Sequence, residues 1–98
     1  MICGFLKRKD QKIVDGQDRE IILKGWGLGN WMLQEGYMWK CPSPRFDRPR
    51  RIEQVVEELT GKEFSQWFWF QFRQNYIRRE DIHAMAQLGY NSVRIPFN

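Results

Sequence analysis

The stretch LGYNSVRIPFN, residues 88–98, decides the fold because it combines the pattern of a β-strand with an arginine. Val93, Ile95 and Phe97 fall on one face by the two-residue period of a strand, and Arg94 falls on the other face. The guanidinium of Arg94 is therefore expected to point away from the side that packs on a helix. It must face water, another chain or a polar site.

Farther back in the chain, residues 52–59 have the pattern of an amphipathic helix that Gly61 stops. Its apolar residues follow the spacing i, i+3, i+4 and i+7: Ile52, Val55, Val56 and Leu59. A further helix is predicted at about residues 79–88, ending at Gly89, with three side chains facing inward: Ile82, Met85 and Ala86.

Between these two helices, residues 62–74 predict another helix that is unusually rich in aromatic residues. Four apolar side chains form its expected packing stripe: Phe64, Trp67, Phe68 and Phe72. Trp69 and Phe70 widen the apolar surface beyond what one neighbouring element would cover. We therefore expect further protein to pack against this helix.

The first part of the chain predicts a hairpin, a strand and a long loop. Apolar runs at residues 13–14 and 21–23 are separated by Asp15, Gly16 and Asp18, which favour a turn, so the two runs predict a hairpin. After Leu28 the sequence is rich in glycine, tryptophan and proline and has neither helical nor strand periodicity. Long irregular loops in compact domains are often functional.

The order hairpin, strand, loop, helices, strand predicts an α/β fold with two parallel strands and a right-handed crossover. Parallel sheets are buried on both faces, and two strands alone would leave open edges. We therefore expect this chain to be the beginning of a larger α/β domain, with the sequence stopping inside the fold.

Composition excludes several classes of protein. The chain has 98 residues, of which 42% are hydrophobic, so it forms one domain or part of one rather than a disordered segment. The net charge of +4 is a modest surplus that could favour an acidic partner but also fits an ordinary solvated surface, and we do not expect a nucleic-acid partner. Cys3 and Cys41 lack the spacing of a zinc site or a disulfide framework, which indicates free thiols. With no signal peptide or membrane-spanning segment recognised, we expect a cytoplasmic protein without a membrane partner.

Two longer stretches carry a family resemblance: ILKGWGLGNWMLQEGYMW, residues 22–39, and NYIRREDIHAMAQLGYNSVRIPFN, residues 75–98. Together with the hairpin, they resemble the N-terminal part of glycoside hydrolase family 5, the cellulase family. The resemblance implies a (β/α)8 TIM barrel of roughly 250 residues or more, of which this chain is an incomplete N-terminal portion. Residues 1–24 would form the capping hairpin and the start of the first strand, 25–50 the strand end and loop, 51–88 the helices, and 89–98 the second strand.

The resemblance also implies a function. The family retains anomeric configuration by using two glutamates about 5 Å apart, both on later strands, so no catalytic residue would lie in this chain. The substrate would be a β-linked oligo- or polysaccharide, cleaved internally or at chain ends, without metal or cofactor. Arg94 would support catalysis by hydrogen-bonding the nucleophilic carboxylate and keeping it ionised. The alternative is a structural arginine paired with any barrel carboxylate.

Five residues of the loop after the first strand are candidate substrate contacts. By the resemblance, Glu35 would accept hydrogen bonds from sugar hydroxyls, and a loop-tethering role is equally compatible. Trp31, Tyr37 and Trp39 offer flat faces to a sugar, although aromatic side chains in such a loop more often pack it down. Asn30 is a weaker candidate. The chain departs from the family pattern at Gly27, where asparagine is common, and at Arg78, where a capping Thr or Ser is common.

Other polar residues have simpler interpretations. Glu53 and Glu57 lie one helical turn apart on what we expect to be a solvated face, and His83 has no second ligand at metal spacing. Four arginines surround Phe46 in a proline-rich loop that we expect to be solvated: Arg45, Arg48, Arg50 and Arg51. The competing function is a small noncatalytic module that binds nucleic acid or sugar. As an isolated fragment, the chain is expected to be inactive and to self-associate.

Overall fold

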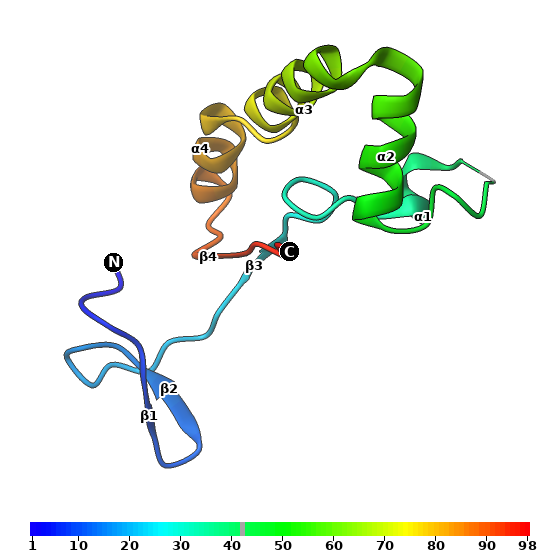
Figure 1. The fold of residues 1–98 in the computed structure, drawn as a ribbon. Helices are drawn as coiled ribbons and strands as arrows, with labels where there is room; N and C mark the ends of the chain where they lie inside the picture. Colours follow the sequence, from blue (N-terminus) through cyan, green and yellow to red (C-terminus); the bar gives the residue numbers. More distant parts are fainter. Residues whose placement is uncertain (42) are drawn as a thin grey trace.

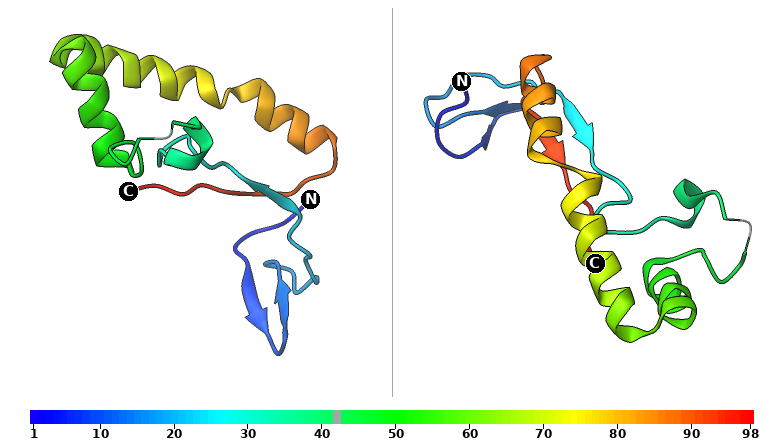
Figure 2. Two further views of the ribbon diagram at one scale, coloured as in Figure 1. Left: turned by 90° about the vertical axis from the view of Figure 1, so that its right-hand side faces the viewer. Right: turned by 90° about the horizontal axis from the view of Figure 1, so that it is seen from above.

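A computed structural model describes residues 1–41 and 43–98 (Figure 1). The elements follow one another in this order: β1 (Lys7–Lys9), β2 (Lys12–Val14), β3 (Gly25–Gly27), α1 (Gly36–Trp39), α2 (Pro49–Thr60), α3 (Lys62–Tyr76), α4 (Arg79–Gln87) and β4 (Ser92–Arg94). The helices α2, α3 and α4 form an arch over β3 and β4, while the hairpin of β1 and β2 projects away from it (Figures 1 and 2). The chain is thus an open arrangement of helices, a strand pair and a hairpin.

The strands β3 and β4 pair in parallel, as predicted. Gly25 lies opposite Ser92 and Gly27 lies opposite Arg94. Gly25 is required here because a Cβ atom at this position would collide with the carbonyl and hydroxyl oxygens of Ser92. Asn91 fixes the start of the pair, since its Oδ1 accepts from the Lys24 N–H at 2.8 Å and its Nδ2 donates to the Ile22 carbonyl at 3.0 Å.

The two faces of β4 follow the predicted alternation at Val93. A shallow cavity of about 250 Å³ is lined by Val93 together with three side chains of α4: Ile82, Met85 and Ala86. Val93 therefore faces the helix. The three side chains expected to face inward from α4 thus lie on the side of β4, although none of the residues of α4 is buried among the described residues.

The three predicted helices are confirmed with small changes in their bounds. Pro49 at the first turn begins α2, where a missing N–H costs nothing. Gly61 stops α2 with a φ of 83°, and Gly89 follows α4 with a φ of 86°, both in a region that favours glycine. Asp81 accepts from the Arg78 N–H at 2.7 Å, so the N-terminus of α4 is capped without a Thr or Ser.

The packing stripe of α3 differs from the prediction. Trp69, expected on the margin, is only 5% exposed and is the most buried aromatic residue of α3, whereas Phe64, Trp67 and Phe70 are each at least half exposed. Phe72 packs inward, stacking on Trp39. The prediction failed because aromatic residues surround α3 on both faces, so their spacing alone does not identify the packed one.

The hairpin also lies elsewhere than predicted. Its strands are β1 and β2, joined by a turn in which Asp10 has a φ of 53°, and residues 21–23 form no strand. The chain does return beside β2, because the Ile21 N–H bonds the Ile13 carbonyl at 2.9 Å. The strand β1 was missed since Lys-Arg-Lys offers no apolar alternation. The short helix α1 was likewise missed within the loop.

The hydrophobic core is small. Among residues 1–41 and 43–98, four hydrophobic residues are buried, and they are spread over the hairpin, the β3 loop and two helices: Val14, Leu28, Ile52 and Trp69. The radius of gyration is 18.1 Å, compared with about 13 Å for a compact domain of this length. Within the described residues, no helix combines the length and apolar character needed to cross a membrane.

Candidate functional site

The candidate site lies where β3 and β4 end, because both strands point their carboxyl ends the same way. The Leu28 N–H donates to the Arg94 carbonyl at 2.8 Å, and Met32 forms a parallel bridge with Phe97 farther along. The loop after β3 therefore runs beside the continuation of β4. In parallel α/β folds, functional side chains gather at this end of the strands.

The side chain of Arg94 is exposed at this end. None of the ion pairs formed by the described residues includes it. These ion pairs do not test the choice between a supporting role for Arg94 in catalysis and a structural pairing with any barrel carboxylate, and both stay predictions.

Glu35 immediately precedes α1 and is half-buried. Its backbone N–H donates to Asn30 Oδ1 at 3.0 Å, and its Oε2 accepts from the Tyr37 hydroxyl at 3.3 Å. Gly29 leaves room for the carboxylate, since a Cβ atom at that position would lie 2.9 Å from Glu35 Oε2. Local contacts thus involve both the backbone and the carboxylate of Glu35, although the carboxylate's hydrogen bond to Tyr37 is exposed.

Asn30 is turned into the protein. It is only 5% exposed, its Oδ1 accepts from Glu35, and its Nδ2 lies 3.4 Å from the hydroxyl of Tyr76 on α3. Its φ of 61° lies in the left-handed region, where Asn is better tolerated than most residues. These contacts support the loop; they do not present Asn30 to a solute.

The aromatic candidates divide into two groups. Trp31 Nε1 donates to the Arg73 carbonyl at 2.8 Å, and Trp39 stacks on Phe72 with ring centroids 5.4 Å apart. Both tryptophans therefore pack the loop against α3. Tyr37 differs because it is 78% exposed, so its ring has a free face beside Glu35.

The structure brings Glu35, Asn30 and Tyr37 together, and it adds Tyr76, which sequence reasoning missed. Tyr76 stacks on Phe72 with centroids 4.8 Å apart and reaches Asn30 from the end of α3. The signal was the spacing of Trp69, Phe72 and Tyr76 at i, i+3 and i+7, which places the three on one face. No hydrogen bond in the described residues joins this group to the Arg94 side chain.

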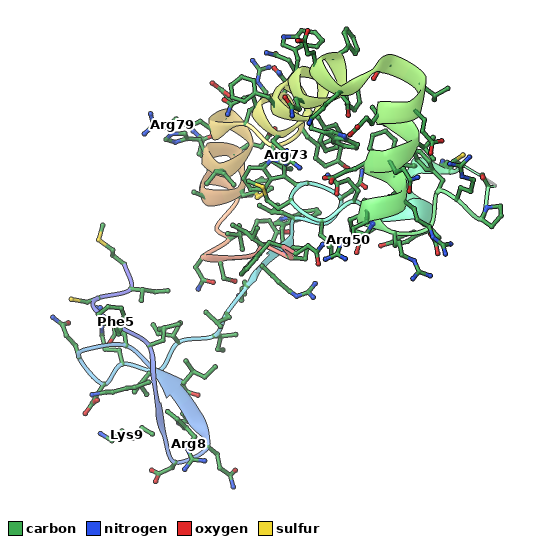
Figure 3. The ribbon with its side chains drawn as sticks, viewed as in Figure 1. Phe5, Arg8, Lys9, Arg50, Arg73 and Arg79 are labelled. Carbon is green, nitrogen blue, oxygen red and sulfur yellow. The ribbon has the colours of Figure 1, made fainter. Side chains whose placement is uncertain are left out.

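The other polar candidates have structural partners or lie at the surface. Glu53 pairs with Arg73 at 3.1 Å, on the side of α3 that faces α2 (Figure 3), so it is less solvated than expected. Glu57 and His83 are exposed. Among the described residues, no three His, Cys, Asp or Glu side chains are grouped to hold a metal ion, and Cys3 and Cys41 are exposed free thiols.

The arginine-rich loop is largely neutralised by acidic neighbours. Arg45 pairs with Glu58 at 2.6 Å and lowers the pKa of that carboxyl through its hydrogen bond. Arg48 pairs with Asp47 at 3.0 Å and lowers its pKa in the same way. Arg50 and Arg51, which the sequence placed in the loop, lie instead in the first turn of α2. Arg51 also reaches Asp47, at 3.4 Å, while Arg50 lies at the surface (Figure 3). The pairing of Arg45 and Arg48 supports the interpretation of a solvated loop before the helix.

Comparison with known proteins relates the chain to glycosidases. It is 34% identical over 95 residues to a beta-xylosidase from Phanerodontia chrysosporium, an alignment that covers 97% of this chain and 19% of that protein. It is 28% identical over 75 residues to the probable glucan 1,3-beta-glucosidase A of Aspergillus clavatus, covering 76% and 18%, respectively. No family model and no solved structure matches the chain. The chain spans about a fifth of the length of these curated relatives, and it is related in sequence to that part of two glycoside hydrolases.

Proposed function

We propose that this chain is part of a retaining glycoside hydrolase of family 5 that cleaves β-linked glucans or related saccharides. The observation that carries the proposal is the parallel pair β3–β4, which places the Glu35 loop and Arg94 at the same ends of two strands. The relatives named as a beta-xylosidase and a glucan 1,3-beta-glucosidase support β-linked xylosides and β-1,3-linked glucosides as the first substrates to test.

In this proposal, β3 and β4 are the first two strands of a (β/α)8 barrel, and the helices α2 to α4 form the crossover between them. The open outer edges of the two-stranded sheet support further strands on either side. The hairpin would cap the other end of the barrel.

The chemistry would be a double displacement on the anomeric carbon. One glutamate protonates the leaving oxygen while the other attacks, and water then hydrolyses the glycosyl intermediate. Both glutamates would come from protein outside this chain. Arg94 would donate hydrogen bonds to the nucleophile and favour its ionised form, and Glu35 would accept hydroxyl hydrogens of the sugar beside the cleaved bond. The reaction requires neither metal nor cofactor.

The test uses the complete enzyme with aryl β-xyloside, aryl β-glucoside and a β-1,3-glucan. We expect release of the aryl group from at least one glycoside, and proton NMR should show the β-anomer of the sugar first. An initial α-anomer would contradict the retaining mechanism. Saturable sugar binding without any hydrolysis would instead support a noncatalytic sugar-binding module.

A further inference from the structure

We propose that Asn30, held by Tyr76, is a positioning residue that sets the Glu35 carboxylate for its substrate. This inference rests on the proposed function, because it gives Glu35 a sugar hydroxyl to bind. It also changes the part assigned to Asn30: the residue acts through Glu35 and not by touching the sugar.

Asn30 connects two elements, because its side-chain amide contacts both the end of α3 and the residue before α1. Its Oδ1 accepts from the Glu35 N–H at 3.0 Å, and its Nδ2 lies 3.4 Å from the Tyr76 hydroxyl. With the side chain 95% shielded from solvent, losing either partner would leave a buried amide group unsatisfied. Asn30 is therefore a fixed link between the end of α3 and the residue that begins α1.

The left-handed backbone conformation of Asn30 forms the turn that leads to Glu35. A φ of 61° turns the chain sharply after Gly29, and this turn brings the Glu35 side chain back over Gly29. The Cβ that Gly29 lacks would lie 2.9 Å from Glu35 Oε2, closer than Cβ atoms normally approach an oxygen. Gly29 and Asn30 together thus shape the space that the carboxylate occupies.

Tyr76 is itself held in place by aromatic stacking. Tyr76 stacks on Phe72, which stacks in turn on Trp39 at the end of α1, with centroids 4.8 and 5.4 Å apart. Trp31 is tied to the same helix through its bond to the Arg73 carbonyl. The loop is therefore attached to α3 on both sides of Glu35, and Asn30 is the contact that reaches the Glu35 backbone directly.

The experiment is a double-mutant cycle in the complete enzyme between Asn30→Gly and Glu35→Ala. Glycine adopts the same φ without strain, so Asn30→Gly removes both amide contacts while keeping the turn. We expect Asn30→Gly to lower kcat/KM about tenfold when Glu35 is present, and by less than about twofold when Glu35 is alanine. Asn75→Ala, which removes an exposed amide elsewhere on α3, is the matched control and should leave kcat/KM within about twofold.

Hydrogen exchange gives a readout that does not depend on activity. Asn30→Gly should speed exchange of the Glu35 amide, measured by mass spectrometry over residues 30–37, at least about tenfold. Asn30→Asp keeps an oxygen that accepts from Glu35 and should restore slow exchange. Tyr76→Phe should give an intermediate rate, because Asn30 keeps its bond to Glu35 but loses its anchor.

Each result bears separately on the two proposals. If Asn30→Gly lowers kcat/KM by the same factor with and without Glu35, Asn30 is merely structural and the inference fails while the proposed function stands. If the complete enzyme hydrolyses no glycoside, the proposed function fails. Independently of activity, unchanged exchange of the Glu35 amide in Asn30→Gly would overturn the inference. If Glu35→Ala leaves kcat/KM unchanged, the inference also fails.

Discussion

Arg94 is the residue for which the proposed function makes the sharpest prediction. Arg94 is the last residue of β4, and its side chain is exposed. Its backbone carbonyl accepts a hydrogen bond from the Leu28 N–H, which holds its backbone in place. In the proposed enzyme, replacing it with alanine should lower kcat roughly thirtyfold to a thousandfold, since a charge-assisted bond to a buried carboxylate is worth about 2 to 4 kcal/mol. KM should change far less. Steady-state kinetics on an aryl glycoside measures both.

The pH profile separates this role from a structural one. Without the cation, the nucleophile's pKa should rise, so the acidic limb of kcat/KM should move to higher pH in Arg94→Ala. Arg94→Lys should recover part of the loss, because it keeps the charge but not the planar fork of donors. A folded Ala variant within about threefold of the parent, with its acidic limb unmoved, would make Arg94 structural.

Asp15 is a buried carboxylate whose role is to hold the N-terminal segment. Its oxygens accept from the backbone N–H groups of Cys3, Gln17 and Arg19, and the Arg19 guanidinium adds bonds at 2.7 and 3.0 Å. The hydrogen bond from Arg19 does most to lower the pKa of Asp15 below its usual range. On the hairpin, Lys7 and Lys9 likewise lower the pKa of Asp18 to about 2.

These carboxylates predict acid sensitivity of the hairpin. A pKa that is lower in the folded state than in the unfolded state stabilises the fold above the unfolded value of about 4, and this contribution is lost as pH falls below it. Hydrogen exchange over residues 1–20 should therefore speed up, after correction for intrinsic rates, between about pH 4 and 2. Asp15→Asn should speed it already at pH 7, and the difference from the parent should shrink toward pH 2. A pH-independent difference would contradict this assignment.

At the scale of elements, the sequence predicted helices better than strands. The existence of α2, α3 and α4 followed from helical spacing of apolar residues, and the ends of α2 and α4 followed from Gly61 and Gly89, both of which have positive φ in the structure. The strand β1 and the helix α1 were missed because a run of exposed lysines and a four-residue helix carry no hydrophobic period. Local pattern also could not choose the packed face of α3, because tertiary contacts with α1 decide it.

The same limit applies to the candidate site. The loop that carries Glu35, and the end of β4 that carries Arg94, were located from sequence. The bond from Asn30 to Glu35 and the contact with Tyr76 were not, since they join residues up to 46 positions apart through a turn with positive φ. Such contacts depend on how α3 packs over the loop, which no local pattern encodes.

The alignment of β3 with β4 depends on Asn91, whose side-chain amide makes two hydrogen bonds to the backbone just before β3. Asn91→Ala removes the two bonds to the Lys24 N–H and the Ile22 carbonyl and should lower the free energy of unfolding by about 1 to 2 kcal/mol. Urea denaturation of the proposed enzyme measures this loss. Asn75→Ala, which removes an exposed amide on α3, is the control and should cost less than about 0.5 kcal/mol. Equal effects of the two variants would show that Asn91 does not fix the register.

At the scale of the whole molecule, the described chain exposes more surface than a compact protein of its mass. Its accessible surface is 8045 Å², whereas a folded monomer of 12.0 kDa exposes about 6000 Å². The excess of roughly 2000 Å² falls within the range of stable protein interfaces. Apolar side chains contribute to it on the outer face of α3 and on the strand pair, including Phe64, Trp67, Phe70, Trp26 and Ile95.

This exposure predicts that the isolated 98-residue chain self-associates. On α3, Phe64, Trp67 and Phe70 follow one another at i, i+3 and i+6, each is at least half exposed, and the rings of Phe64 and Trp67 pack with centroids 5.1 Å apart. Light scattering after size exclusion should give a mass well above 12.0 kDa at micromolar concentration. Replacing the three residues with glutamine should shift the mass toward that of the monomer. Leu59→Gln, which alters a single residue that is 79% exposed on α2, should shift it much less.

The strand edges supply a second route to association, and the triple glutamine variant distinguishes it from the first. The strands β3 and β4 each leave one edge unpaired, so added strands from other copies could continue the sheet. Association through the edges alone would leave the mass of the triple variant unchanged, and an amide-I infrared band for intermolecular β-structure would rise with concentration. Association through α3 should give no such band. A monodisperse 12.0-kDa monomer with a sharp cooperative melt would contradict both routes, because it would show that the exposed surface needs no partner.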